Sequence, residues 1–335
     1  MKVKCLTLIL AFCLNVSILL SQDRFCVIEF NVENLFDCRH DSLKQDTEFL
    51  PESIRGWNFF RFKEKVERIA KVIYAAGVDD VPALVGLCEV ENDFCIQSLV
   101  RFSSLKEVGY RYVMTESPDL RGIDVALLYQ PQRFKLSATE RVRVEYPDAK
   151  RPTRDLLHVT GRVAAGDTID VFVCHMPSRT GGRKVSEPYR VFTATLLKQQ
   201  VEAVMRQRTA PNIIVMGDFN DYPDNYPICG VLGAKKPDGA VDGNHLYNLM
   251  DGKKGGTYKY KGEWGILDHM IVNGRLLDEN NRLHTSYEAA EILNFPFLLE
   301  EDEKTGGMKP FRTYNGMRYN GGYSDHLPIR MVLKE

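Results

Sequence analysis

Several polar residues of this chain stand at the ends of short apolar segments, where they could act together on one substrate. The clearest case is Gly217-Asp218-Phe219-Asn220, which follows the apolar residues 213–216. Those residues predict a buried strand, and Gly217 allows a sharp turn after it. Alternate residues of an extended chain point to the same side, so Asp218 and Asn220 would share a face. Together they could orient a water molecule and hydrogen-bond a phosphoryl oxygen; the alternative is an Asx turn after the strand.

A further carboxylate, Glu89, ends the apolar segment 82–88. A lone carboxylate there would be poorly solvated, and a divalent cation is its simplest stabilising partner. Mg²⁺ usually takes one or two protein carboxylates and keeps several waters, so Glu89 with help from Asp325 or Glu33 would suffice. The alternative is an exposed glutamate that begins a loop.

Two histidines border predicted strands: His175 follows residues 168–174, and His326 precedes residues 327–333. A histidine in such a position is more often structural than catalytic. Asp268, however, could orient His326 and stabilise its charged form, as in many general acid–base pairs. No serine stands in a nucleophile-elbow setting, which argues against serine hydrolase chemistry.

Three arginines could recognise phosphate. Arg179 lies in a loop rich in Gly and Arg just after His175, and Arg121 and Arg154 stand elsewhere in the chain. The planar guanidinium group suits phosphate oxygens. For each arginine the alternative is a solvated basic loop.

The elements that must position these side chains alternate between strands and helices. Residues 59–76 show apolar residues at helical spacing before Gly77, which predicts an amphipathic helix. Further helices are predicted at 94–105 and 188–208, and strands at 25–31, 82–88, 110–115, 124–129, 133–144, 156–163, 168–174, 213–216, 257–260, 267–272 and 327–333. The pattern is weak over 223–256, and 288–313 reads as an irregular insertion. This order favours packed sheets flanked by helices in a single domain over residues 22–335.

The first 21 residues have a different character. Lys2 and Lys4 precede an apolar run over residues 5–20, and Ser21 is small enough to precede a cleavage site. This pattern predicts a secretory signal peptide over residues 1–21. A transmembrane anchor is the alternative, but the run is short and two polar residues interrupt it. We therefore expect a mature protein that is exported to the periplasm or the medium and keeps no stable membrane anchor.

The composition narrows the classes of partner. Without Lys2 and Lys4, 42 basic residues face 45 acidic residues. This balance argues against tight, sequence-independent binding of a long polyanion, which needs a broad basic surface. Cys26, Cys88 and Cys174 fall within apolar strand patterns, which favours buried free thiols, and no zinc spacing is present.

Taken together, these segments resemble the endonuclease/exonuclease/phosphatase superfamily over residues 25–333. The segments that carry the resemblance occur in the order of that family: Phe30-Asn31-Val32-Glu33-Asn34-Leu35-Phe36, Leu87-Cys88-Glu89-Val90-Glu91-Asn92, His175, Gly217-Asp218-Phe219-Asn220, Leu267-Asp268-His269 and Asp325-His326. The resemblance implies an α/β four-layer sandwich, in which two packed mixed β-sheets are flanked by helices, and metal-dependent cleavage of phosphoester bonds.

The resemblance also implies roles for individual residues. Glu89 would be the principal Mg²⁺ ligand, with Asn31, Glu33 and Asp325 close to the metal, and Mn²⁺ could replace Mg²⁺. His326, paired with Asp268, would act as general base or contact the phosphoryl group, and Asp218 is the competing candidate for the base. Asn220 and His175 would hold and neutralise the phosphate oxygens, and Arg179, Arg121 and Arg154 stay candidates from their guanidinium chemistry alone.

The expected activity is therefore that of an exported, Mg²⁺-dependent phosphodiesterase, monomeric, with nucleic acid among its candidate substrates. The alternatives are a sphingomyelinase-type or phosphomonoester hydrolase, and a catalytically inactive binding protein on the same fold. Inositol-polyphosphate 5-phosphatases of this superfamily carry Cys-Asp-Arg around the position of Asp268. Leu267 and His269 stand there in this chain, which argues against inositol-phosphate specificity.

Overall fold

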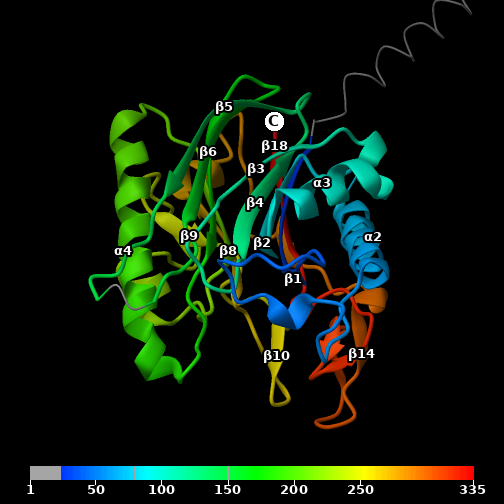
Figure 1. Ribbon diagram of the computed structural model, residues 1–335. Coiled ribbons are helices and arrows are strands. Elements are labelled where there is room, and N and C mark those ends of the chain that lie inside the picture. The colour runs from blue at the N-terminus through cyan, green and yellow to red at the C-terminus, as the bar shows by residue number, and fades with distance from the viewer. Residues whose placement is uncertain (1–23, 79, 149–150) are drawn as a thin grey trace, which may run out of the picture.

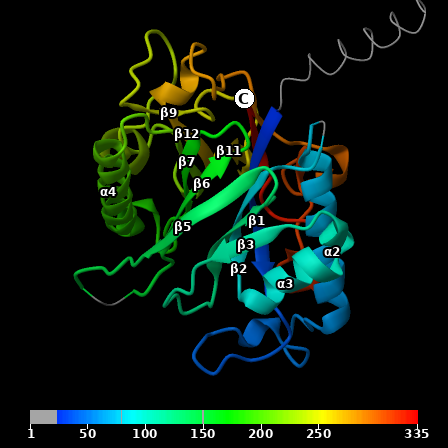
Figure 2. The ribbon, with the colours of Figure 1, turned by 90° about the horizontal axis from the view of Figure 1, so that it is seen from above.

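The computed structural model describes residues 24–78, 80–148 and 151–335, so the predicted signal peptide lies outside the described residues. Two six-stranded β-sheets face each other, with helices on both outer sides (Figure 1). Figure 2 shows the same layers from above. This arrangement confirms the predicted four-layer α/β sandwich. None of the helices in the described ranges is long and apolar enough to cross a membrane.

Both sheets are mixed. In the first sheet, with strand order β13-β18-β1-β2-β4-β3, only β1 and β2 run parallel. In the second sheet, with order β5-β6-β7-β8-β12-β9, only β7 and β8 do. The strands of the first sheet are β1 (Arg24–Leu35), β2 (Leu84–Val90), β3 (Arg111–Met114), β4 (Asp124–Tyr129), β13 (Ala290–Ile292) and β18 (Ile329–Lys334). Those of the second are β5 (Phe134–Val142), β6 (Leu156–Val163), β7 (Thr168–His175), β8 (Ile213–Asp218), β9 (Leu246–Asn248) and β12 (Asp268–Asn273).

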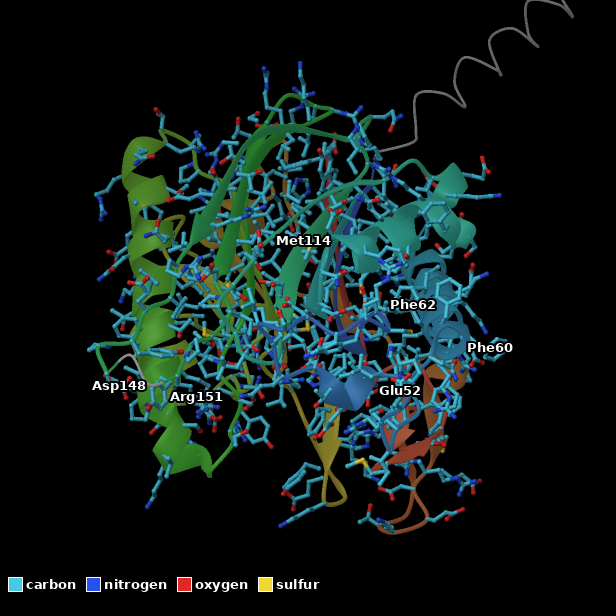
Figure 3. The ribbon with its side chains drawn as sticks, viewed as in Figure 1. Glu52, Phe60, Phe62, Met114, Asp148 and Arg151 are labelled. Atoms are coloured by element: carbon cyan, nitrogen blue, oxygen red, sulfur yellow. The ribbon has the colours of Figure 1, made fainter. Side chains whose placement is uncertain are left out.

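Helices α2 (Phe59–Ala76) and α3 (Asp93–Phe102) cover the outer face of the first sheet. The bounds of α2 are those predicted from its apolar spacing. Within α2 the Phe62 side chain is buried, whereas that of Phe60 is exposed and points away from the protein (Figure 3). The helix begins where the Asn58 side chain accepts hydrogen bonds from backbone N–H groups of the first turn.

Helix α4 (Arg183–Gln207) covers the outer face of the second sheet. The predicted start at Pro188 was wrong, because proline is frequent but not obligatory at the first helical position. The helix begins earlier, where the backbone N–H and the hydroxyl of Ser186 both donate to the Gly182 carbonyl, at 3.1 and 2.9 Å.

Short hairpins stand at the lower end of the sandwich in Figure 1, below the C-terminal end of β1. They are β10 (Tyr258–Tyr260) with β11 (Glu263–Gly265), β14 (Leu299–Glu301) with β15 (Met308–Pro310), and β16 (Tyr314–Asn315) with β17 (Arg318–Tyr319). The segment read as an irregular insertion thus carries β14 and β15, and also β13 at the edge of the first sheet. Short 3₁₀ helices span Thr47–Phe49, Ser104–Glu107, Gly274–Leu277 and Pro296–Leu298, and a π-helix spans Pro227–Leu232.

The inner faces of the two sheets form one apolar core. Gly86 on β2 shows how closely they pack, because a Cβ atom there would lie 2.8 Å from Cε of Met216 on β8. The six described cysteines are all free, and Cys26, Cys88 and Cys174 are buried, as predicted. At the lower end of this core, polar residues replace the apolar side chains.

Candidate active site

Three polar side chains form a row across neighbouring strands of the second sheet. The pairing of β7 with β8 sets His175 beside Asp218, and the pairing of β12 with β8 sets Asp268 on the other side of Asp218. Each lies two residues from an apolar residue of the inner core, so each points toward the first sheet. All three are buried. Strand register therefore places one imidazole and two carboxylates side by side at the lower end of the core, between the two sheets.

The first sheet contributes Asn31 from β1 and Glu89 from β2. Nδ2 of Asn31 donates to Oδ2 of Asp218 at 3.1 Å, across the space between the sheets. Nε2 of His175 lies 3.5 Å from Oδ2 of Asp218 and 3.9 Å from Oε1 of Glu89. Residues far apart in the sequence thus converge on one pocket.

Several residues of this pocket have a positive φ angle, which sets the direction of their side chains. Five non-glycine residues in the described part of the chain have positive φ, and all but Lys261 border the pocket: Glu33, Asn34, Glu89 and Asn220. The pairing of β1, β2 and β4 also shifts register near Glu89. Such bulges turn a side chain out of its strand alternation and are frequent next to active sites. Here the backbone N–H of Asn34 donates to Oε2 of Glu89 at 2.9 Å.

His326 pairs with Asp268 as predicted, with 2.7 Å between Nδ1 and Oδ2. Its other ring nitrogen, Nε2, lies 3.8 Å from Oδ2 of Asp218. Burial lowers the pKa of His326, but the carboxylates of Asp268 and Asp218 outweigh burial and raise that pKa well above its ordinary value. The hydroxyl of Ser324 accepts from the His326 backbone N–H and donates to the Asn31 carbonyl, which ties the His326 backbone to β1.

Buried carboxyl groups lie close together in the pocket. Burial raises the pKa of Asp218 to about 7, and Asp268 and Glu89 add to that effect while His326 opposes it. Among the described residues, Oδ1 of Asp268 has no hydrogen-bond partner. A cation in the pocket would stabilise these carboxylates.

Sequence reasoning missed Glu29, which lies beneath the pocket on the same side of β1 as Asn31. It is fully buried, and in the described chain neither of its carboxylate oxygens has an N–H or O–H donor. Burial, with Asp268 and Asp218 close by, raises the pKa of Glu29 well above its ordinary value. The available signal was strand alternation, which places Glu29 and Asn31 on one face.

Two predicted metal ligands, Glu33 and Asp325, contact an arginine that sequence reasoning also missed. Nε of Arg312 lies 3.3 Å from Oε1 of Glu33, and its NH2 group lies 2.8 Å from Oδ2 of Asp325. The backbone N–H of Thr313 donates to Oε2 of Glu33 at 2.6 Å. The carboxylate of Asp325 also contributes to the raised pKa of the neighbouring His326. Both carboxylates therefore border the pocket, and metal binding by either stays a prediction.

Arg121 contacts pocket residues of the first sheet, and Arg179 contacts a residue that follows β8 of the second sheet. The NH2 group of Arg121 is 3.5 Å from Oε2 of Glu89 and donates to Oδ1 of Asn34 at 2.5 Å. Nε of Arg179 donates to the Asn220 carbonyl at 2.7 Å. Both guanidinium groups keep some exposure, Arg121 the more, so both could meet an anionic substrate.

The side chains of Arg154 and Asn220 both donate hydrogen bonds to the backbone next to His175. The guanidinium of Arg154 is buried and donates to Oδ2 of Asp119 and to the Met176 carbonyl, at 3.1 and 2.7 Å. Nδ2 of Asn220 donates to the same carbonyl at 3.1 Å and lies 3.2 Å from Oδ2 of Asp218. In this position Arg154 supports the site, and a direct contact with phosphate stays a prediction.

A groove of about 480 Å³ is built from the segments that flank the pocket residues in sequence. Tyr222 and Trp264 supply aromatic surfaces, and Asp224, Asp251 and Glu263 supply carboxylates. The groove continues to Ile266, two residues before Asp268. The Arg179 guanidinium lies 4.3 Å from the centre of the Tyr222 ring, which links this groove to the pocket.

Comparisons with solved structures find the same fold in other proteins. A mannosyl-6-phosphatase of Bacteroides thetaiotaomicron is similar over 93% of this chain and 100% of its own, with a TM-score of 0.58 and 15% identity. The human Nocturnin catalytic domain with bound sulfate covers 93% of this chain and 94% of its own, with a TM-score of 0.56 and 17% identity. D. rerio TDP2 complexed with single-strand DNA product covers 93% and 100%, with a TM-score of 0.57 and 12% identity.

At these identities the structural likeness shows the fold alone. No curated protein matches the chain in sequence. A family model, however, matches residues 26–335, which is nearly all of the part that the structure describes. The chain belongs to the endonuclease/exonuclease/phosphatase family.

Proposed function

We propose that this chain is an exported, divalent-cation-dependent hydrolase that cleaves phosphodiester bonds by in-line attack of water. The convergence of Glu89, His175, Asp218 and the Asp268–His326 pair in one pocket carries the proposal. Carboxylates suit a hard cation, and imidazole and arginine suit the phosphoryl oxygens. Water attack on phosphorus needs both kinds of group, because negative charge grows on those oxygens.

The donors of the pocket fit Mg²⁺ or Mn²⁺. Glu89 and Asp218 offer carboxylate oxygens within 3.9 Å of one ring nitrogen, and the unpartnered Oδ1 of Asp268 lies in the same buried row. Asp218, Asp268 and His326 offer atoms that all lie within 4.8 Å of one another. Glu89 would hold the ion, with Asn31 and Asp218 beside it. The bound ion would supply charge for the phosphoryl oxygens.

The proton of the attacking water has two possible acceptors. Asp268 fixes Nδ1 of His326, so Nε2 is the atom that could exchange a proton with water or a phosphoryl oxygen. A His326 that stays protonated would instead donate to the phosphoryl group, and Asp218 would then accept the proton of water. Both residues lie in the pocket, and either could accept this proton.

Turnover of bis-p-nitrophenyl phosphate with and without EDTA tests the proposal. EDTA should abolish turnover, and added Mg²⁺ or Mn²⁺ should restore it. Glu89→Ala should lower kcat by about 10³-fold or more, because the principal ligand is lost. Glu107→Ala, which removes an exposed glutamate outside the pocket, is the matched control and should keep full activity. Full activity of Glu89→Ala, or in EDTA, would contradict the proposal.

The groove favours a second candidate, hydrolysis of a phosphomonoester on a hydroxylated group such as a sugar. Aromatic faces and carboxylates suit a neutral polyol, whereas Asp224, Asp251 and Glu263 would repel a polyanion. Similarity to a mannosyl-6-phosphatase points the same way. A panel of plasmid DNA, RNA, sphingomyelin, mannose 6-phosphate, inositol phosphates and p-nitrophenyl phosphate would separate the candidates. No turnover of any substrate would favour a binding protein on this fold.

Export is the remaining part of the proposal, and it rests on residues 1–21, which the structure does not describe. N-terminal sequencing of the protein from a native host should find a chain that begins near Gln22. An intact Met1 on that protein would contradict export by signal cleavage.

A further inference from the structure

Glu33 and Asp325, from distant parts of the chain, share one guanidinium group. Arg312 lies 3.3 Å from the Glu33 carboxylate and 2.8 Å from that of Asp325, so it bridges them. The next residue, Thr313, also binds Glu33 through its backbone N–H. A cation supplied by the protein therefore already occupies the space between two carboxylates of the pocket.

A second protein cation, Lys65 on α2, lies close to the same pair. The side chain is 1% exposed, and its Nζ donates to Oγ1 of Thr313 and to the Tyr323 carbonyl, both at 2.6 Å. Burial lowers the pKa of this ammonium group, and the nearby carboxylates of Glu33 and Asp325 oppose that effect. Two buried or half-buried cations thus balance two carboxylates on this side of the pocket.

The other side of the pocket is different. Within the described ranges, neither Asp218 nor Asp268 has an Arg or Lys partner, and their close cationic contacts are histidines. Glu89 has the partly exposed Arg121 at 3.5 Å. Among the described pocket residues, the carboxylates of Glu89, Asp218 and Asp268 therefore lack a buried Arg or Lys partner, unlike those of Glu33 and Asp325.

We infer that Arg312 is a built-in cation of the site, which takes the place that a second metal ion could occupy beside Glu33 and Asp325. The chain then binds one divalent cation, on the Glu89 side, and Arg312 is a positioning residue that fixes Glu33 and Asp325. This inference rests on the cation dependence in the proposed function. The Arg312 side chain is 37% exposed, so an ion from solvent could reach this side once the guanidinium is removed.

Mn²⁺ binding to the purified chain, measured by electron paramagnetic resonance and calorimetry, tests the inference without an activity assay. The unaltered chain should bind one Mn²⁺. Arg312→Met should bind a second Mn²⁺, more weakly than the first because Lys65 remains. Arg208→Met is the matched control: Arg208 is 35% exposed and also binds a carboxylate, that of Asp170, at the start of β7. This control should still bind one Mn²⁺.

Two milder variants serve if Arg312→Met does not fold. Arg312→Gln removes the charge but keeps a hydrogen-bond donor and should bind two Mn²⁺, whereas Arg312→Lys keeps the charge and should bind one. Two Mn²⁺ on the unaltered chain, or one on folded Arg312→Gln, would overturn the inference and leave cation dependence intact. No Mn²⁺ on the unaltered chain, with turnover in EDTA, would instead remove the proposed function.

Discussion

Asn31 and Asp218 form a 3.1 Å hydrogen bond that joins the two sheets of the sandwich at the pocket. Asn31 lies on β1 of the first sheet, and Asp218 ends β8 of the second. Oδ1 of Asn31 also accepts from the Glu33 backbone N–H at 3.0 Å. One carboxamide therefore fixes both the position of a key carboxylate and the irregular last part of β1, where the pairing with β2 shifts register.

Replacing this carboxamide should affect catalysis. Asn31→Ala removes the donor that orients Asp218, so kcat should fall by roughly 10²-fold or more. Steady-state kinetics with bis-p-nitrophenyl phosphate would measure the change. Asn280→Ala, at an exposed turn, should leave kcat unaltered. An Asn31→Ala protein with normal kcat would show that Asp218 needs no such orientation.

Asp268→Asn tests the pairing with His326. The amide keeps the shape of the side chain but loses the charge that holds His326 in one orientation and stabilises its charged form. We expect kcat to fall by roughly 10³- to 10⁴-fold with little change in KM. Asp242→Asn, an exposed carboxylate that pairs with His245, is the matched control. Equal losses in both variants would argue against a specific role for the Asp268–His326 pair.

Glu91 should make stability depend on pH. Burial raises its pKa to about 8 from an ordinary value of 4.5, and Asp37 and Asp46 contribute. Between these values the folded chain keeps a proton that the unfolded chain releases. Stability from this group is therefore present below pH 4.5 and falls, by at most about 1.4 kcal/mol per pH unit, as pH rises to 8.

Urea unfolding at pH 5 and pH 8.5 would measure this loss. Glu91→Gln resembles the protonated side chain at every pH, so the difference in unfolding free energy between the two pH values should shrink. An exposed glutamate such as Glu107 should not alter that difference when replaced by Gln. An unchanged pH dependence in Glu91→Gln would contradict the raised pKa.

Gly217 should not tolerate a side chain. Its φ is +145°, and a Cβ atom there would lie 1.8 Å from the Cys174 carbonyl oxygen on β7. Gly217→Ala must therefore separate β7 from β8 just beside His175 and Asp218. We expect the free energy of unfolding to fall by about 3 kcal/mol or more. Gly243→Ala has its nearest contact at 3.8 Å and should cost little. Thermal unfolding of both variants would compare them, and equal Tm values would refute the steric argument.

The sequence alone determined the positions where polar residues interrupt apolar segments. Asp218, Glu89 and His175 could be identified because strand and helix periodicity is local and visible along the chain. The same local signal gave the bounds of α2 correctly. The family resemblance supplied the architecture and the expected roles.

Only the tertiary structure determined which charged side chains contact one another. Glu33 and Arg312 are 279 residues apart, and no local pattern predicts that they pair, because ion pairing depends on the distance between folded segments. The row of His175, Asp218 and Asp268 likewise depends on strand register, which non-local hydrogen bonds fix. The local order of residues therefore indicated which side chains could take part in the chemistry. Long-range packing determined which charged side chains lie next to one another.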